Sequence, residues 1–411
     1  MFQTARSPAV RQLILMWLAW FIILFVYQAF VTSRLALSRP DFALQWTRAE
    51  TDYGSQRNKP YLNEPFMNAQ VSWDSEHYLS IAIGGYDDPA ARRIVSPEGG
   101  PPVPPLQLNY AFFPLYPLLM RVVAAPLPLF GLTPTAAATL AGVIVSLAGT
   151  LAAMLALYDL VRERLSESGG QRAAFYLLVF PSGFFLAQVY SEGLFVGLAF
   201  GALALMKRER LLIAGALAAL AVWTRAVGVA LVLPLALAWL MRLRSRGLTS
   251  RSAVAGLAAA LLPLVAYGLW NAALGEPFHI VEAYYFRRGA LLVEWSLKAW
   301  QTTFALIGGA NPQASAYYAL EFGGMALALA ACLLMLPRYP GPALFGLGAL
   351  VIAFTSGVPQ SMIRYVLVVP PLYILPAWLG RWPAFDRAWT TASLLWMGLL
   401  AALFSFDMWV G

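Results

Sequence analysis

The chain has 411 residues, of which 60% are hydrophobic and 12% are charged, and its formal net charge is +8. An ordinary soluble domain carries about 25% charged residues, so this composition excludes a soluble globular protein. The apolar runs do not alternate as barrel strands do, which leaves an all-α polytopic membrane protein. The single Cys332 excludes a disulfide framework and a thiolate metal site. No basic tract with interleaved aromatic residues is present, so a nucleic-acid partner is excluded too.

The N-terminal part predicts one membrane helix followed by a large loop. An apolar run over residues 13–32 is long enough to span a bilayer, and no small-residue cleavage site follows it, so we expect an uncleaved first helix. A polar, proline-rich stretch comes next. Within residues 110–130 four prolines and Arg121 interrupt the apolar sequence, and proline disrupts a helix. We therefore expect a re-entrant or interfacial helix there, and an outer loop over residues 33–133.

Ten further apolar segments predict the remaining helices and bring the total to about eleven spans. Basic residues favour the cytoplasmic side, and placing the N-terminus inside puts at least one arginine or lysine in every inner loop. The chain is thus expected to form a single membrane domain over residues 1–411, with the C-terminus outside and a second outer loop over residues 273–313. The ten segments are 135–160, 173–189, 191–206, 211–224, 226–241, 252–272, 314–336, 341–356, 361–379 and 388–409.

The first outer loop contains the sequence SWDSEHYLSIAIGGY at residues 72–86, where two acids and a histidine fall within four positions. A serine or Asp74 at its start can cap a helix that ends at the following pair of glycines. On this helix Asp74, His77 and Tyr78 share one face, whereas Glu76 points elsewhere. Asp74 is then either a helix cap or a general base at the outer membrane face. The positive helix end weakens a carboxylate as a base, and partial desolvation strengthens it.

Five stretches resemble, in type and order, the signatures of the PIG-V family. WDSEHYLSIAIGGY resembles its W-D-x-x-x-(Y/F)-x-x-I-A-x-x-G-Y motif. Four later stretches resemble its F-F-P-x-Y-P, Y-(S/T)-E-x-L-F, T-R-x-x-G-x-x-x-x-x-P and (M/I)-R-Y segments. Together the matches reach from Trp73 to Tyr373, which is most of the chain. The later stretches are AFFPLYPLLMR, VYSEGLFVGLAF, AVWTRAVGVALVLP and SMIRYVLVVPPLY.

The resemblance implies a mannosyltransferase of the GT-C class, which transfers a sugar from a polyprenyl-phosphate donor to a hydroxyl at the outer membrane face. In GT-C enzymes an acid of the first outer loop is the catalytic base, and the matching residue is Asp74. The attacking hydroxyl loses its proton to a carboxylate, and the leaving phosphate needs a nearby arginine or lysine. Direct attack opposite the leaving group inverts the anomeric carbon. A retaining reaction needs a second carboxylate, and the nearest candidate, Glu76, points away.

Further candidate residues lie at the outer ends of the predicted helices. Arg364 and Arg225 are candidates for binding the donor phosphate, with snorkelling as the alternative. Glu192 is a candidate substrate ligand, with helix capping as the alternative. Arg287 and Arg288 could meet an acidic acceptor, but interfacial anchoring is the favoured interpretation. The remaining candidate substrate-binding residues are Trp73, Glu76, His77, Tyr78 and Tyr190.

Asp74, Ser75 and Glu76 fit a loose D-x-E pattern that holds a divalent metal in some GT-C enzymes. A polyprenyl monophosphate has no diphosphate to neutralise, and helical spacing separates the two carboxylates unless the first turn unwinds. We therefore expect neither a metal ion nor another cofactor. His279, the second of the two histidines in the chain, is expected to be an ordinary loop residue.

Two other functions remain open, namely a GT-C transferase for another sugar or a protein acceptor, and a lipid or sugar transporter. Transporters place charges near the bilayer midplane, whereas here the charges cluster at helix ends and in the outer loops. The lack of an N-x-S/T sequon and the short loops favour a prokaryotic source, which makes no GPI anchor. The expected location is then the plasma membrane, with the active site on the outer face (the lumenal face of the endoplasmic reticulum in a eukaryote). The expected partners are a polyprenyl-phosphate sugar, a glycolipid or lipid-linked acceptor, and membrane lipid.

Overall fold

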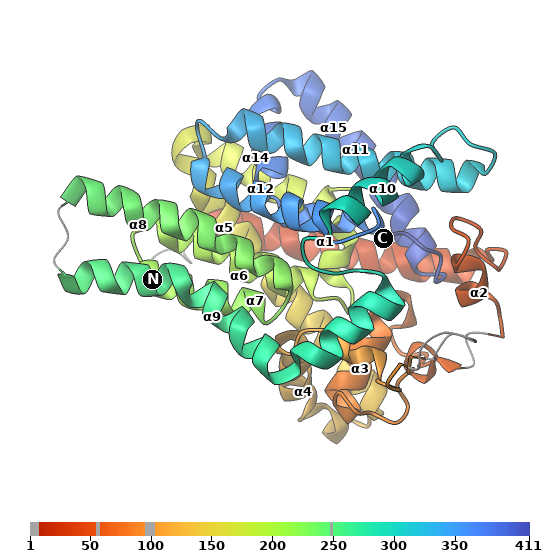
Figure 1. Ribbon diagram of the computed structural model, residues 1–411. Coiled ribbons are helices and arrows are strands. Elements are labelled where there is room, and N and C mark those ends of the chain that lie inside the picture. The colour runs from red at the N-terminus through yellow and green to blue at the C-terminus, as the bar shows by residue number, and fades with distance from the viewer. Residues whose placement is uncertain (1–7, 55–57, 95–102, 247–249) are drawn as a thin grey trace.

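The computed structural model describes residues 8–54, 58–94, 103–246 and 250–411. These residues form helices and no β-strand (Figure 1), which confirms the predicted all-α class. The elements of the first half are α1 (Pro8–Arg34), α2 (Thr47–Thr51), η3 (Pro60–Leu62), η4 (Asn68–Gln70), α3 (Ser75–Gly84), η5 (Leu108–Ala111), α4 (Leu115–Ala124), η6 (Leu127–Phe130), α5 (Pro134–Val179), η7 (Gly183–Ala187) and α6 (Glu192–Lys207).

Within the described part of the chain, six helices are long and apolar enough to cross a membrane, or seven if a helix pair bent by 80° counts as one span. The protein is therefore a multi-pass membrane protein, as predicted. The number of about eleven spans stays a prediction. The elements of the second half are α7 (Leu211–Val222), η8 (Ala226–Leu231), α8 (Val232–Arg246), α9 (Ser250–Val281), η9 (Glu282–Phe286), α10 (Val293–Phe304), α11 (Pro312–Met335), α12 (Pro340–Thr355), α13 (Met362–Tyr365), η10 (Val366–Val368), α14 (Pro371–Leu379) and α15 (Pro383–Phe404).

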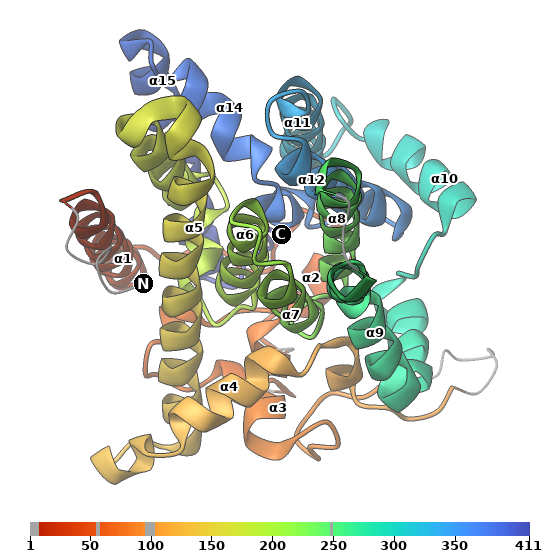
Figure 2. The same ribbon diagram turned by 90° about the vertical axis from the view of Figure 1, so that its left-hand side faces the viewer.

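The helices pack around α6 and α7, which lie near the centre of the bundle when it is viewed end-on (Figure 2). Helix α5 lies on one side of this centre, with α1 on its outer surface, and α8 and α9 lie on the opposite side. Helices α3 and α4 cover a third side and α11, α12 and α14 a fourth. Helices α3 and α4, from the segment predicted as the first outer loop, thus pack directly onto the membrane helix α5.

Small residues bring α5 and α6 into close contact. A Cβ atom added at Gly149, Gly193 or Gly197 would clash with backbone atoms of the facing segment, so only glycine permits this approach. Ser146 also donates a hydrogen bond of 2.8 Å to the carbonyl of Tyr190. This contact fixes the start of α6, where the stretch VYSEGLF begins.

Helix α3 follows the prediction for the first-loop motif. It begins at Ser75 and ends at Gly84, and the C-cap residue Gly85 has a φ of 89°, which suits glycine. The Arg121 side chain of α4 satisfies the last carbonyls, since it donates two hydrogen bonds of 2.8 Å to the oxygens of Ile81 and Ala82. Asp74 occupies the N-cap position, but its side chain makes no capping hydrogen bond. The interpretation of Asp74 as a helix cap is therefore wrong.

Several predicted boundaries differ from the structure. The segments 135–160 and 173–189 belong to α5, whose backbone breaks at Ser166 (φ 68°, ψ 173°). The second of them stops being α-helical at Val179, because Pro181 follows and proline cannot continue the hydrogen bonding of a helix. Helix α9 runs beyond residue 272, where the second outer loop was expected to begin, and reaches Val281.

Candidate active site

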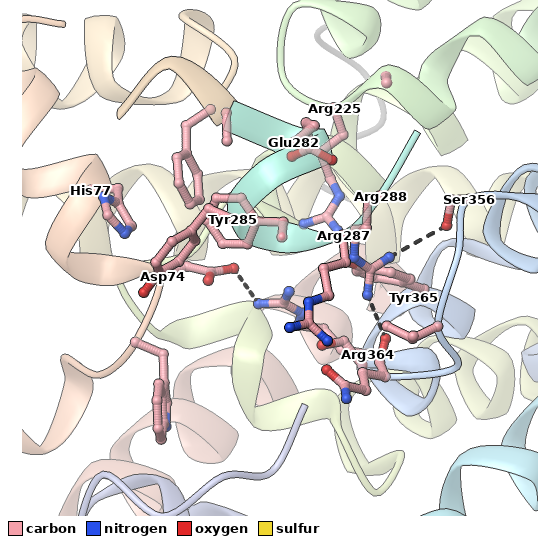
Figure 3. Close-up of a pocket in the computed structure, with 18 of the residues that line it drawn as sticks. Asp74, His77, Arg225, Glu282, Tyr285, Arg287, Arg288, Ser356, Arg364 and Tyr365 are labelled. Atoms are coloured by element: carbon pink, nitrogen blue, oxygen red, sulfur yellow. Dashed lines mark hydrogen bonds and ion pairs between the residues drawn. The ribbon is translucent and has the colours of Figure 1, made fainter. Parts of the chain in front are cut away.

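The first-loop motif and three of the later motifs line one cavity of about 740 Å³. Its walls come from the start of α3, the segment between α7 and η8, the turn η9 and the segment that joins α12 to α13 (Figure 3). The remaining motif, VYSEGLFVGLAF at the start of α6, lies directly behind this wall. The charged and phenolic residues of the lining are Glu50, Asp74, His77, Tyr78, Arg92, Arg225, Glu282, Tyr285, Arg287, Arg288, Arg364 and Tyr365.

Asp74 points its carboxylate into the cavity and is bound to Arg364 (Figure 3). Its Oδ2 atom accepts a hydrogen bond of 2.6 Å from Nη1 of Arg364, and its backbone N–H donates to the hydroxyl of Tyr190 at 3.2 Å. Among the described residues no side chain or backbone group bonds Oδ1. One carboxylate oxygen is thus held in place, and the other can accept a proton from a bound hydroxyl.

Arg364 and Arg225 lie inside the protein and share an acidic partner. Glu192 Oε1 lies 3.5 Å from Nε of Arg364 and also forms a short ionic hydrogen bond with Arg225. The two arginine side chains are 5% and 16% exposed, so neither snorkels to a membrane surface. Glu192 lies in the first turn of α6, where an acid is favourable, and its carboxylate also pairs with both arginines. Because Asp74 pairs with Arg364 as well, the four charges balance.

The Tyr365 ring draws three cations to one side of the cavity. The guanidinium carbons of Arg225, Arg288 and Arg364 lie 5.4, 4.9 and 5.4 Å from its centroid. A cation over an aromatic face is stabilised by about 0.5–2 kcal/mol, and the upper end of this range applies where water is excluded. The ring therefore holds these cations together without neutralising them.

Helix α11 fixes the turn that carries Arg364. The backbone of Ser361 is left-handed with a φ of 66°, and its N–H donates a hydrogen bond of 3.1 Å to the hydroxyl of Tyr317. The N–H of Ile363 donates to Oε2 of Glu321 at 2.9 Å. Glu321 is fully buried, and a carboxylate at a helix N-terminus is favourable. These contacts set the direction of α13 and so the position of Arg364.

Arg287 and Arg288 also point into the cavity, from the end of the π-helical turn η9 (Figure 3). Arg288 donates to the carbonyl of Gln360 at 2.8 Å and to Oγ of Ser356 at 3.4 Å. For Arg287 the described residues provide no ion pair and no side-chain hydrogen bond. Both arginines thus belong to the cavity wall and add positive charge to it, and their role as interfacial anchors stays a prediction.

A separate ion-pair cluster explains the position of Glu76. Arg92 donates to Oε1 of Glu76 at 3.1 Å, to Oε2 of Glu50 at 3.0 Å and to the hydroxyl of Tyr285 at 3.1 Å. Burial raises the pKa of Glu50, but Arg92 and Lys59 outweigh it and the net pKa shift is downward. Glu76 is absent from the cavity lining. Arg92 therefore ties the first loop to Tyr285 of η9, and Glu76 faces away from the catalytic candidate as helical spacing predicts.

His77 and Tyr78 come from the same face of α3 as Asp74 and line the cavity. The His77 ring stacks on Phe112 at a centroid distance of 4.6 Å. Burial lowers its pKa, and although Glu76 opposes this effect the net shift is downward, so the ring is neutral at neutral pH. The Tyr78 hydroxyl lies 2.8 Å from Oγ of Ser191. The predicted residues Tyr190 and Glu192 lie behind the wall and hold Asp74, Arg225 and Arg364.

Three tryptophans close one side of the cavity. The rings of Trp46, Trp73 and Trp409 meet edge to face at centroid distances of 4.7 to 5.8 Å. Trp73 was predicted from the motif, and its indole N–H donates to the carbonyl of Met408 at 3.3 Å. Sequence reasoning missed the other two, because Trp46 lies on another segment of the loop and Trp409 lies more than 330 positions away, so neither carries a local signal of this contact.

Another part of the cavity lining is apolar. It is formed by short and aromatic hydrophobic side chains from η8, α9, α12 and η10, which include Ala226, Val227, Phe278, Ala349, Ile352 and Val368.

Within the described ranges, no group of three or more His, Cys, Asp or Glu side chains is placed to hold a metal ion. Asp74 is bound to Arg364 and Glu76 to Arg92. The turn between the two carboxylates is helical. Independence from divalent metals stays a prediction.

The family model described as "Mannosyltransferase (PIG-V)" matches residues 10–288. Two curated relatives are named GPI alpha-1,6-mannosyltransferase 2. The protein from Mus musculus is 31% identical over 202 residues, which cover 47% of this chain and 35% of the relative. The protein from Cricetulus griseus is 33% identical over 172 residues, which cover 41% of this chain and 31% of the relative. The matched segment thus spans about a third of each curated relative.

Two solved structures are similar over much of the chain. ArnT from Cupriavidus metallidurans, bound to undecaprenyl phosphate, gives a TM-score of 0.47 at 16% identity and covers 84% of this chain and 62% of its own. The apo oligosaccharyltransferase from Archaeoglobus fulgidus gives a TM-score of 0.45 at 14% identity and covers 96% of this chain and 56% of its own.

Proposed function

The chain belongs to the PIG-V mannosyltransferase family, and from this membership and the cavity we propose that it is a membrane mannosyltransferase. The donor is polyprenyl-phosphate mannose, and the acceptor is a hydroxyl of a glycolipid or a lipid-linked glycan. The reaction takes place at the outer face of a prokaryotic plasma membrane. A single observation carries the proposal, namely that one cavity joins an exposed carboxylate oxygen of Asp74, an arginine-rich wall and an apolar wall.

The arginine-rich wall suits the phosphate of the donor. Arg225 and Arg364, the candidates from the sequence, are already balanced by Glu192 and Asp74, so they contribute little net charge. Arg287 adds a cation without an ion pair in the described chain. We assign the phosphate to the space between this residue and Arg364, where guanidinium groups can form charge-assisted hydrogen bonds with its oxygens.

The apolar wall suits the lipid part of the donor. The side chains of η8, α12 and η10 that line it carry no hydrogen-bonding groups, and burial of each isoprenoid methylene gains about 0.8 kcal/mol. The phosphate would then lie where the apolar wall meets the arginines, with the sugar toward α3.

Asp74 is assigned as the general base. Its Oδ1 atom accepts the proton of the acceptor hydroxyl as that oxygen attacks the anomeric carbon, and the bond to the donor phosphate breaks. The departing phosphate gains a negative charge, which the arginine wall stabilises. The salt bridge to Arg364 keeps Asp74 oriented during this step. Glu76, the carboxylate nearest to Asp74 in the sequence, is bound to Arg92 and is absent from the lining, so it is not placed to form a glycosyl intermediate, which supports inversion.

The proposal is tested by transfer of mannose from radiolabelled polyprenyl-phosphate mannose into lipid extract, with purified protein in lipid nanodiscs. We expect radiolabelled glycolipid to form and the rate to be unchanged by EDTA. Loss of activity with EDTA and its return with Mg²⁺ or Mn²⁺ would contradict metal independence. Transfer from another polyprenyl-phosphate sugar alone, or into protein alone, would contradict the assigned substrates and keep the reaction type.

Replacing Arg287 by glutamine tests the assignment of the phosphate. We expect the KM for the donor to rise about 10- to 100-fold, since a hydrogen bond to a charged group contributes about 1.5–3 kcal/mol. The KM for the acceptor should not change. The matched control is Lys298→Gln, which removes a cation that is 75% exposed and lies outside this cavity. An unchanged donor KM in Arg287→Gln would remove this residue from the phosphate site.

A further inference from the structure

A chain of hydrogen bonds behind the cavity fixes the orientation of the Asn109 amide. Asn109 is fully buried, and its Nδ2 atom lies 3.2 Å from the carbonyl oxygen of Gly85 and 2.8 Å from Oγ of Ser80. A backbone carbonyl can only accept a hydrogen bond. The amide nitrogen must therefore face Gly85, and the amide oxygen Oδ1 faces the other way.

The hydrogen bonds beyond Ser80 confirm the direction of donation from Asn109 to Ser80. Asp88 Oδ2 accepts hydrogen bonds from Oγ of Ser80, at 2.7 Å, and from the hydroxyl of Tyr61. The Ser80 proton is thus committed to Asp88. The Ser80 oxygen is left to accept from Asn109, in agreement with the direction set by Gly85.

This orientation determines where His77 carries its proton. The Oδ1 atom of Asn109 lies 3.2 Å from Nδ1 of His77. Because an amide oxygen only accepts, Nδ1 must hold the hydrogen, and a neutral imidazole then has a bare lone pair on Nε2. The side chain lines the cavity while the residue is only 3% exposed, and no hydrogen bond to Nε2 occurs in the part of the chain that the structure describes.

We propose that His77 accepts a hydrogen bond from a substrate hydroxyl through Nε2, and that Asn109 is the positioning residue that fixes this tautomer. The hydroxyl contact rests on the proposed function, whereas the tautomer does not. His77 lies one helical turn from Asp74 on the same face of α3. The two side chains can thus hold two hydroxyls of bound sugar. Asp74 would bind the attacking hydroxyl, and His77 would bind a second hydroxyl that positions the sugar. An anion is excluded as the partner, because a bare nitrogen lone pair repels phosphate.

The tautomer is tested by ¹⁵N NMR of the full chain labelled at histidine, in lipid nanodiscs at neutral pH and with a purification tag free of histidine. The chain contains only His77 and His279, so His279→Gln assigns both spectra. We expect a protonated Nδ1 and a bare Nε2 for His77. We expect Asn109→Leu, which removes the acceptor, to abolish this preference. A protonated Nε2, or a charged ring, would overturn the proposal.

The hydroxyl contact is tested by a pair of substitutions. Glutamine can place its amide oxygen near the position of Nε2, whereas asparagine is too short and reaches only the position of Nδ1. We expect His77→Gln to keep kcat/KM within about tenfold of the wild type and His77→Asn to lose about 10- to 100-fold more. Thermal unfolding of both variants controls for folding.

The outcomes separate the two proposals. Equal losses in the two variants, with equal unfolding temperatures, would overturn the hydroxyl contact and leave the mannosyltransferase standing. A wild-type protein that transfers no mannose would overturn the proposed function and the contact with it. In that case the NMR experiment still decides the tautomer.

Discussion

Replacing Asp74 by asparagine should lower kcat by about 10²- to 10⁴-fold, which is the range that a positioned general base contributes. Asparagine has nearly the same shape, and its amide oxygen can still accept the hydrogen bond of Arg364. Arg364 also keeps its contact with Glu192. The substitution therefore removes the proton acceptor while the wall around it stays in place. The measurement is the rate of mannose transfer at saturating donor and acceptor.

Two comparisons make this prediction specific. The KM for the donor should stay within about threefold, because the arginines that we assign to the phosphate are unchanged. The matched control is Asp87→Asn, which alters an exposed carboxylate bonded to Tyr110 at the other end of the same loop motif. If Asp74→Asn retains transfer at the rate of Asp87→Asn, Asp74 is not the base.

Replacing Arg364 by glutamine should destabilise the folded protein by about 1.5–3 kcal/mol, because the partly exposed carboxylate of Asp74 loses a charge-assisted hydrogen bond. Arg364 is 4% exposed and neutralises Asp74 at 2.6 Å. Native proteins are stable by only about 5–15 kcal/mol in total, so the variant should unfold at a much lower temperature. The measurement is tryptophan fluorescence during heating in nanodiscs.

The double variant Asp74→Asn, Arg364→Gln separates stability from activity. Once Asp74 carries no charge, the missing arginine leaves no unpaired carboxylate, because Glu192 keeps its ionic bond to Arg225. We expect most of the stability to return, because the effects of two substitutions on a contacting pair do not add in a double-mutant cycle. Mannose transfer should stay absent. A double variant as unstable as Arg364→Gln alone would show that the cation is held for its contacts with the aromatic rings.

The local part of the site was predictable from the sequence, because it depends on helical periodicity. The glycine pair and the spacing of Asp74, His77 and Glu76 define α3 and the faces of its side chains. Arg225, Glu192 and Arg364 were found from short motifs in apolar surroundings, where a charge is costly and so informative. The sequence did not show that these residues pair with one another and with Asp74.

The contacts that the sequence did not predict depend on backbone geometry. Arg287 and Arg288 follow a tyrosine-rich run, and only the π-helical turn at the end of α9 places them in the cavity wall. Arg92 was not singled out, because its partners lie 16 and 42 positions away on other segments. Ser361 adopts a left-handed backbone conformation, which the sequence does not indicate because the residue is not glycine. Glu321 and Tyr317 of α11, which stabilise this turn, resemble ordinary helix residues in the sequence.

The bond between Asp74 and Arg364 joins positions 290 residues apart, and this separation imposes an order on biogenesis. A ribosome adds about 5–20 residues per second, so roughly 15–60 s pass between synthesis of the acid and of its partner. During that interval the nascent chain contains the candidate base but neither the arginine that orients it nor Trp409, which closes the cavity. If Asp74 is the base, we expect a chain that ends before residue 364 to be inactive, and activity to arise only when synthesis is nearly finished.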